Sequence, residues 1–147
     1  MKNMRYLLKT ALTVVAFLLI SNISFAQTVT KSPAELANGK QFIVDADIPW
    51  QDLGGGLKRK IMSYDPTMMM VKIIFEKGGI GKPHKHVHTQ MSYVESGVFE
   101  VTIADKKQTL KAGDGYYIPS NVMHGAVCIE AGVLIDMFTP MREDFVK

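Results

Sequence analysis

Short apolar-rich segments of five to ten residues, bounded by Gly, Pro, Asn or Asp, recur along this chain from residue 57 onwards. Apolar and polar residues alternate within several of them; Phe99, Val101 and Ile103, for example, share one face of 98–103. No segment sustains a period of about 3.6 residues, so the pattern indicates half-buried strands rather than helices. Seven or more such strands predict an all-β, antiparallel sandwich or closed barrel of the jelly-roll type. The segments are 57–64, 68–76, 88–94, 98–104, 114–119, 124–130 and 132–140.

The first 26 residues have the pattern of a signal peptide. Lys2, Arg5 and Lys9 form a basic head, an apolar run follows, and Ser24-Phe25-Ala26 supplies the small residues of a cleavage site before Gln27. An uncleaved membrane anchor is the alternative, which the short run and the lack of a following charge cluster disfavour. The pattern therefore predicts export to the bacterial periplasm, with no stable membrane insertion after cleavage.

The remaining chain, 27–147, is long enough for one domain and too short for two. The leader holds three of the 17 Lys and Arg residues, so 14 remain against 14 Asp and Glu. A neutral chain gives no electrostatic reason to expect nucleic acid or a membrane surface as a partner. The single cysteine, Cys128, lies in an apolar run and is expected to be a small buried side chain rather than a reactive thiol.

All four histidines lie in two segments. His84, His86 and His88 alternate and Gln90 continues the same parity, so these side chains would share one side of a strand. His124 lies on a later segment, which an antiparallel fold can bring opposite the first group. Alternate histidines can present ring nitrogens to one metal ion, and polar residues scattered on a solvent-facing strand would not explain the shared parity. The pattern predicts a metal site.

The spacing around these histidines resembles the first signature motif of the cupin superfamily. Gly78, His84, His86, Gln90 and Gly97 are separated by five, one, three and six residues, as in that motif, except that the family's usual glutamate is Gln90 in this sequence.

A second stretch, fifteen residues further on, resembles the second cupin motif. Gly113, Pro119 and His124 match it, Asn121 replaces the common glycine, and Cys128 stands where the family often has asparagine. The resemblance implies a single-domain cupin β-barrel over 49–147, after a lead segment at 27–48. It also implies that His84, His86, Gln90 and His124 hold one divalent metal ion, with His88 as a pocket residue or a partner of the ligands.

Gln90 changes the charge expected of such a site. Three neutral imidazoles and a neutral amide leave the charge of a divalent ion at plus two, where a carboxylate would lower it to plus one. A site of this kind should attract an anionic substrate, such as a carboxylate or a developing enolate. Neutral nitrogen and amide ligands admit nickel, zinc, iron, cobalt or manganese.

A narrower resemblance covers most of 50–145. The histidine-rich stretch ending in glutamine, together with IDMFTPMREDF at 135–145, is similar to the small KdgF-type cupins, pectin-degradation proteins that linearise unsaturated monouronates. It implies that Asp136, Phe138 and Arg142 are the catalytic residues. Departures are minor: Thr89 stands where a glutamate often precedes the glutamine, and Glu95-Ser96-Gly97 stands where Leu-Glu-Gly is commoner.

The implied reaction is ring opening and tautomerisation of a 4,5-unsaturated monouronate, from pectin or alginate breakdown, to linear 5-keto-4-deoxyuronate. Asp136 suits the general acid and base because a carboxylate in an apolar strand needs a task or a partner. The alternative is a structural ion pair with Arg142 or Lys111. Arg142 would clamp the substrate carboxylate or be a solvated surface residue, and Phe138 would wall the sugar ring or belong to the core.

Two other functions and one assembly state stay open. A metal-dependent cupin dioxygenase and a non-enzymatic sugar-acid-binding cupin fit the same motifs, although the neutral Gln90 weakens the first. Small cupins are often dimers, so a homodimer is expected. Arg59, Tyr116 and Tyr117 are further aromatic or cationic side chains for which the sequence leaves pocket and structural roles open.

Overall fold

The computed structural model of this protein describes residues 31–147. The expected signal peptide, 1–26, lies outside the described residues. Among residues 31–147, no helix is both long and apolar enough to span a membrane. The elements are α1 (Pro33–Ala37), η1 (Asp45–Asp47), β1 (Gln51–Gly54), β2 (Leu57–Tyr64), β3 (Met69–Phe75), β4 (Ile80–His84), β5 (Thr89–Ile103), β6 (Lys106–Lys111), β7 (Gly115–Ile118), β8 (His124–Thr139) and η2 (Glu143–Phe145).

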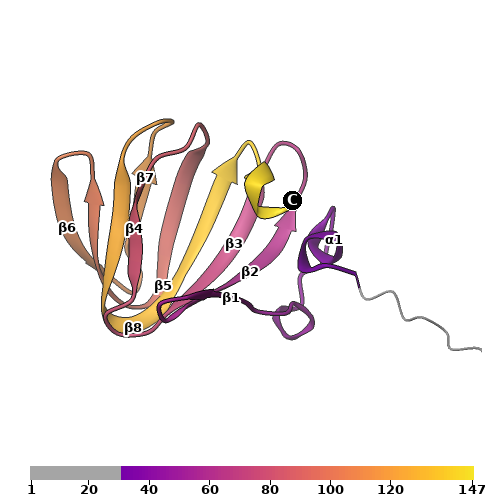
Figure 1. Ribbon diagram of the computed structural model, residues 1–147, viewed down its shortest axis with the longest axis horizontal. Coiled ribbons are helices and arrows are strands. Elements are labelled where there is room, and N and C mark those ends of the chain that lie inside the picture. The colour runs from indigo at the N-terminus through magenta and orange to yellow at the C-terminus, as the bar shows by residue number, and fades with distance from the viewer. Residues whose placement is uncertain (1–30) are drawn as a thin grey trace, which may run out of the picture.

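The strands form one antiparallel, barrel-like sheet, which confirms the predicted all-β class (Figure 1). Its order is β1-β2-β3-β8-β5-β6, with β4 paired to β8 and β7 paired to β5. The 15-residue β5 and the 16-residue β8 pair along most of their lengths and connect the two parts of the sheet. Their central position places residues of both strands on the interior of the barrel.

Four of the predicted strands form only two long strands in the structure. The segments 88–94 and 98–104 are both parts of β5, and 124–130 and 132–140 are both parts of β8. Irregular register marks the junction, where Gly97 has a φ of 82° and a Cβ on Gly132 would collide with the carbonyl of Ser96. The glycines that resemble turn signals therefore allow two bulged strands to cross closely without ending either one.

The histidine stretch also differs from the expected single strand. His84 is the last residue of β4, His86 and His88 lie in the connection to β5, and Gln90 is the second residue of β5. Alternation of side chains over so short a stretch does not distinguish a continuous strand from two strand ends joined by an extended loop.

The core consists of two clusters of buried apolar side chains. One contains Phe75, Val94, Phe99, Val101, Ala126, Cys128 and Leu134, and it confirms that Cys128 is buried. The other contains Ala34, Ala37, Ile61, Met69, Val71 and Phe138. Helix α1 begins with a capping box between Ser32 and Glu35, and its two alanines pack on the second cluster beside β2.

Candidate functional site

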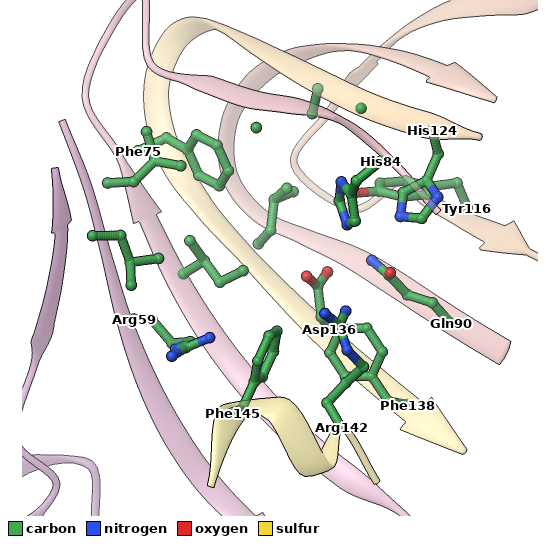
Figure 2. A pocket seen from close by; sticks show the side chains of 17 residues that line it. Arg59, Phe75, His84, Gln90, Tyr116, His124, Asp136, Phe138, Arg142 and Phe145 are labelled. Atoms are coloured by element: carbon green, nitrogen blue, oxygen red, sulfur yellow. The ribbon is translucent and has the colours of Figure 1, made fainter. Parts of the chain in front are cut away.

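A cavity of about 170 Å³ lies inside the barrel and contains most of the predicted site residues. Figure 2 shows the histidines and Gln90 at one end of it, Arg59 and Phe145 at the other, and Asp136 between them. The residues of chemical interest that line it are Arg59, His84, Gln90, Tyr116, His124, Asp136, Phe138, Arg142 and Phe145.

Three histidines from distant parts of the sequence form a cluster. His84 and His124 are register partners on β4 and β8, with ring centroids 4.3 Å apart, and His86 lies 4.9 Å from His124. One ring nitrogen from each lies within 4.8 Å of the others, a spacing at which three imidazoles can bind a single metal ion. The backbone N–H of Asn121 donates to the carbonyl of His86 at 2.7 Å, which ties the His86 loop to the turn that leads into His124.

The backbone conformation of Asn121 explains why the second motif can have asparagine where the family commonly has glycine. Its φ is 62°, in the left-handed region that glycine adopts freely and asparagine adopts more readily than most other residues. The turn before His124 therefore keeps its shape.

Each clustered histidine is oriented by a backbone carbonyl two residues away. Nδ1 of His84, His86 and His124 lies 2.8, 2.9 and 2.9 Å from the carbonyl oxygens of Lys82, His88 and Val122, respectively. A carbonyl only accepts hydrogen bonds, so Nδ1 of each neutral ring carries the proton and donates, and Nε2 keeps a free lone pair. This is the tautomer that a metal ligand requires when it binds through Nε2.

Burial keeps two of these rings neutral. It lowers the pKa of His124 to about 4 and lowers the pKa of His86, and the charge of Arg142 acts on both in the same direction. Nε2 of His124 is buried without a hydrogen-bond partner among residues 31–147. A buried acceptor of this kind, aimed at two other imidazoles, fits a bound cation.

Gln90 adds an oxygen to the cluster. Its side chain is buried, and Oε1 lies 3.1 Å from Nε2 of His86. Because Nδ1 holds the proton of a neutral His86, two lone-pair acceptors face each other across this distance, and a cation between them would relieve the repulsion. The three histidines and Gln90 thus form a donor set that fits a divalent metal ion.

His88 lies outside the three-histidine cluster. Its Nε2 is 2.9 Å from Oε2 of Glu143 in η2, and its carbonyl accepts the hydrogen bond from His86. It connects the histidine loop to the C-terminal turn of the chain.

Asp136 projects from the middle of β8 into the cavity and is buried. The hydroxyl of Ser92 donates to its Oδ1 at 2.5 Å. Burial raises the pKa of Asp136 to about 6, although hydrogen bonds from Ser92 and Gln90 and the charge of Arg142 act in the opposite direction. Among residues 31–147, Asp136 forms no ion pair with Arg142 or Lys111, the alternative that the sequence left open.

Arg142 and Phe138 are both buried at the cavity wall. The guanidinium of Arg142 lies 5.4 Å from the ring centroid of Phe138, and its Nε and Nη2 donate to the carboxylate of Asp144 at 2.9 and 2.7 Å. The arginine is therefore no solvated surface residue. Nη1 and one hydrogen on Nη2 remain for another acceptor.

Comparison with known proteins gives the family. Residues 71–138 match the family described as Cupin domain. The chain is 49% identical over 109 residues to the pectin degradation protein KdgF of Dickeya dadantii (strain 3937), covering 73% of this chain and 99% of that protein. The chain belongs to the KdgF-type cupins.

Solved structures agree with this assignment. An RmlC-like cupin from Shewanella frigidimarina is 45% identical to this KdgF-type cupin, with a TM-score of 0.71 over 73% of this chain and 96% of that one. KdgF from Halomonas sp. is 40% identical, with a TM-score of 0.69 over 71% of this chain and 98% of that one. The similarity thus spans nearly the full length of both relatives.

Sequence reasoning did not single out two residues of the KdgF-type cupin's site: Ser92, which contacts Asp136, and Phe145, which lines the cavity. Ser92 has the same parity as Gln90 on β5, a signal that was available but unspecific. Of the three side chains whose roles the sequence left open, Arg59 and Tyr116 line the cavity, whereas Tyr117 is exposed on the opposite face. Phe145 lies in the charged tail, where no periodicity indicates that it turns back into the barrel.

Proposed function

We propose that this KdgF-type cupin is a metal-dependent linearase of 4,5-unsaturated monouronates derived from pectin or alginate. The observation that carries the proposal is that the buried carboxylate of Asp136 lines the same cavity as His84 and His124 of the three-histidine cluster. The similarity to a pectin degradation protein supports the same class of substrate.

His84, His86, Gln90 and His124 would hold one divalent ion: nickel, zinc, iron, cobalt or manganese. When bound, the ion supplies Lewis-acid stabilisation for negative charge on the substrate oxygens. Because all four donors are neutral, they leave the charge of the ion uncompensated, which favours an anionic sugar over a neutral one.

Asp136 acts as the general base and then as the general acid. It removes the proton of the anomeric hydroxyl, so the carbonyl of the aldehyde forms while the bond between carbon 1 and the ring oxygen breaks. The electron pair of that bond passes to the former ring oxygen, giving an enolate with carbon 5. Asp136 returns the proton to carbon 4, and the product is the linear 5-keto acid. No atom is gained or lost, so no oxidant or second substrate is required.

Arg142 and Phe138 hold the sugar in place for this transfer. The hydrogens of Arg142 that Asp144 leaves free donate to the substrate carboxylate. Phe138 presents an apolar wall to the ring. The buried position of both residues limits the access of water to the reacting atoms.

The test is an assay of residues 27–147 with an unsaturated monouronate prepared by exhaustive lyase digestion, following the ultraviolet absorbance of the conjugated double bond. We expect a loss of absorbance that a chelator stops, and a fall in rate of at least about 100-fold in Asp136→Asn, because general acid and base catalysis contributes that much. His86→Ala should be inactive, and Asp105→Asn, in an exposed turn, should retain activity.

The same assay separates the other candidate functions. No acceleration over uncatalysed ring opening by protein with a filled metal site would overturn the linearase. Oxygen consumption with a redox-active metal would then indicate the dioxygenase. Uronate binding without turnover, little changed by Asp136→Asn, would indicate a sugar-acid-binding cupin.

We also propose that the protein acts in the periplasm, on monosaccharides generated there, and that it is a homodimer. The leader pattern of 1–26 supports export. Exposed Met91, Tyr93 and Tyr117 lie on the outer face of β5 and β7, where a second copy can cover them. Cell fractionation tests the first proposal, and light scattering of the purified protein tests the second.

A further inference from the structure

Ser92 lies between the histidine cluster and Asp136. It follows Gln90 by two residues on β5, is the register partner of Asp136 on β8, and is 3% exposed. Nε2 of Gln90 donates to its hydroxyl oxygen at 2.9 Å, and the hydroxyl donates to Oδ1 of Asp136 at 2.5 Å. One hydrogen-bond chain thus runs from the cluster to the carboxylate.

The chain has a direction because a serine hydroxyl has one hydrogen. When the amide nitrogen of Gln90 faces Ser92, the serine oxygen accepts and its hydrogen is free for Asp136. Rotation of the amide by half a turn would direct Oε1 at Ser92, where it would compete with Asp136 for that hydrogen. The rotated amide would also direct N–H groups at His86, and an N–H group cannot bind a metal ion.

We propose that Ser92 is a positioning residue that fixes the Gln90 amide with its oxygen toward the three histidines. Through Ser92, the oxygen of Gln90 and the carboxylate of Asp136 are oriented together. The inference rests on the proposed metal site and does not depend on the reaction.

This arrangement gives the neutral amide at position 90 a role beyond the charge of the site. A glutamate in the same place would present only acceptor oxygens when ionised. The oxygen facing Ser92 would take the hydroxyl hydrogen, and Asp136 would lose both Ser92 and residue 90 as donors. The amide of Gln90 donates a hydrogen to Ser92, so the serine hydroxyl stays free to donate to Asp136. The amide oxygen stays free to face the three histidines.

The experiment is a double-mutant cycle on metal affinity. Nickel(II) is titrated by calorimetry into the metal-free wild type, Ser92→Ala, Gln90→Ala and the double variant. We expect Ser92→Ala to weaken binding about tenfold, the lower end of the range for residues that orient metal ligands. In the Gln90→Ala background the serine substitution should change the affinity by less than about twofold, because no amide remains to be oriented.

Two further variants separate orientation from general damage to the barrel. Ser92→Thr keeps the hydroxyl and should bind nickel within about threefold of the wild type, well inside the expected loss for alanine. Asp136→Asn keeps an acceptor for the serine hydrogen and should also retain affinity. Melting temperatures measured on all variants identify any that fail to fold.

The outcomes distinguish the role of Ser92, the metal site and the proposed reaction. Equal nickel affinity of Ser92→Ala and wild type would overturn the inference, and so would an equal loss in the Gln90→Ala background. A wild type that binds no divalent ion would overturn the metal site and the inference together. A cycle with the expected coupling in a protein that opens no uronate would support the inference and overturn only the proposed reaction.

Discussion

Within residues 31–147, Asp136 forms hydrogen bonds but no ion pair that would offset the cost of burying its carboxylate. Burial raises its pKa to about 6, and the donors Ser92 and Gln90 and the charge of Arg142 reduce this rise without cancelling it. The ionised side chain is therefore unfavourable for folding near neutral pH. A residue of this kind is explained better by a role in proton transfer than by a role in stability.

Asp136→Asn should stabilise the metal-free protein at neutral pH. The folded-state pKa lies above the ordinary value of 3.8, so the stability that the neutral aspartic acid contributes is present below pH 3.8 and is lost as the pH rises through about 6. Asparagine is neutral at every pH. The melting temperature of the variant relative to wild type should therefore increase between about pH 5 and pH 7.5, as measured by thermal unfolding with a chelator present. If the melting temperatures of the variant and the wild type differed by the same amount at every pH, the raised pKa of Asp136 would be contradicted.

The C-terminal turn, η2 with Arg142 before it, forms one wall of the cavity and is anchored at two places. His88 binds Glu143 on one side. On the other, Phe145 lies 4.0 Å from the guanidinium of Arg59 and 4.2 Å from that of Arg142, measured to its ring centroid. The position of Arg142 thus depends on contacts with β2 and the histidine loop.

Loss of the contact between His88 and Glu143 should weaken substrate binding more than metal binding. We expect Glu143→Ala to raise KM about 3- to 10-fold, the equivalent of one hydrogen bond, while nickel affinity changes little. Glu143→Gln keeps an acceptor and should have a smaller effect, and Glu130→Ala, at an exposed position of β8, serves as the control. Steady-state kinetics and calorimetry measure the two quantities. An unchanged KM in Glu143→Ala would show that the turn holds Arg142 without this bond.

At the level of elements, the alternation of apolar and polar residues predicted most of the strands. The main source of error was the set of glycines that resemble turn signals. The pattern around Phe99 indicated a strand, but Gly97 and Gly132 resembled turns because a bulge and a turn use the same residue type. Asp136 stood out as a carboxylate among apolar residues, and alternation indicated the inward position of Gln90. It could not indicate that Ser92 joins them, because that contact depends on the register of β5 against β8, which are 44 residues apart at this point.

In the molecule as a whole, the proposed ligands come from β4, its loop, β5 and β8, and the cavity lies among residues of both core clusters. A bound ion would connect parts of the sheet that are remote in sequence. Ligands that bind only the folded state raise its stability by mass action. The metal site should therefore be visible in thermal unfolding even without a substrate.

Nickel at 100 times its dissociation constant should raise the melting temperature by about 10 °C, since the linkage is worth about 2.7 kcal/mol and a domain of this size gains several degrees per kcal/mol. A chelator should reverse the rise. His124→Ala should abolish it, and His88→Gln, outside the cluster, should retain it. Differential scanning calorimetry checks these outcomes, and an equal rise in His124→Ala would place the ion elsewhere.

The carbonyl that holds each clustered imidazole has a consequence for the order in which the holoprotein assembles. Because every ring is restrained by a residue only two positions away in its own segment, the orientation of each imidazole is set locally, and the pairing of β4 with β8 brings the rings together. Small domains whose ligands are disordered until metal arrives must fold around it. We therefore expect this barrel to fold first, to acquire its ion afterwards, and to exchange one ion for another without unfolding.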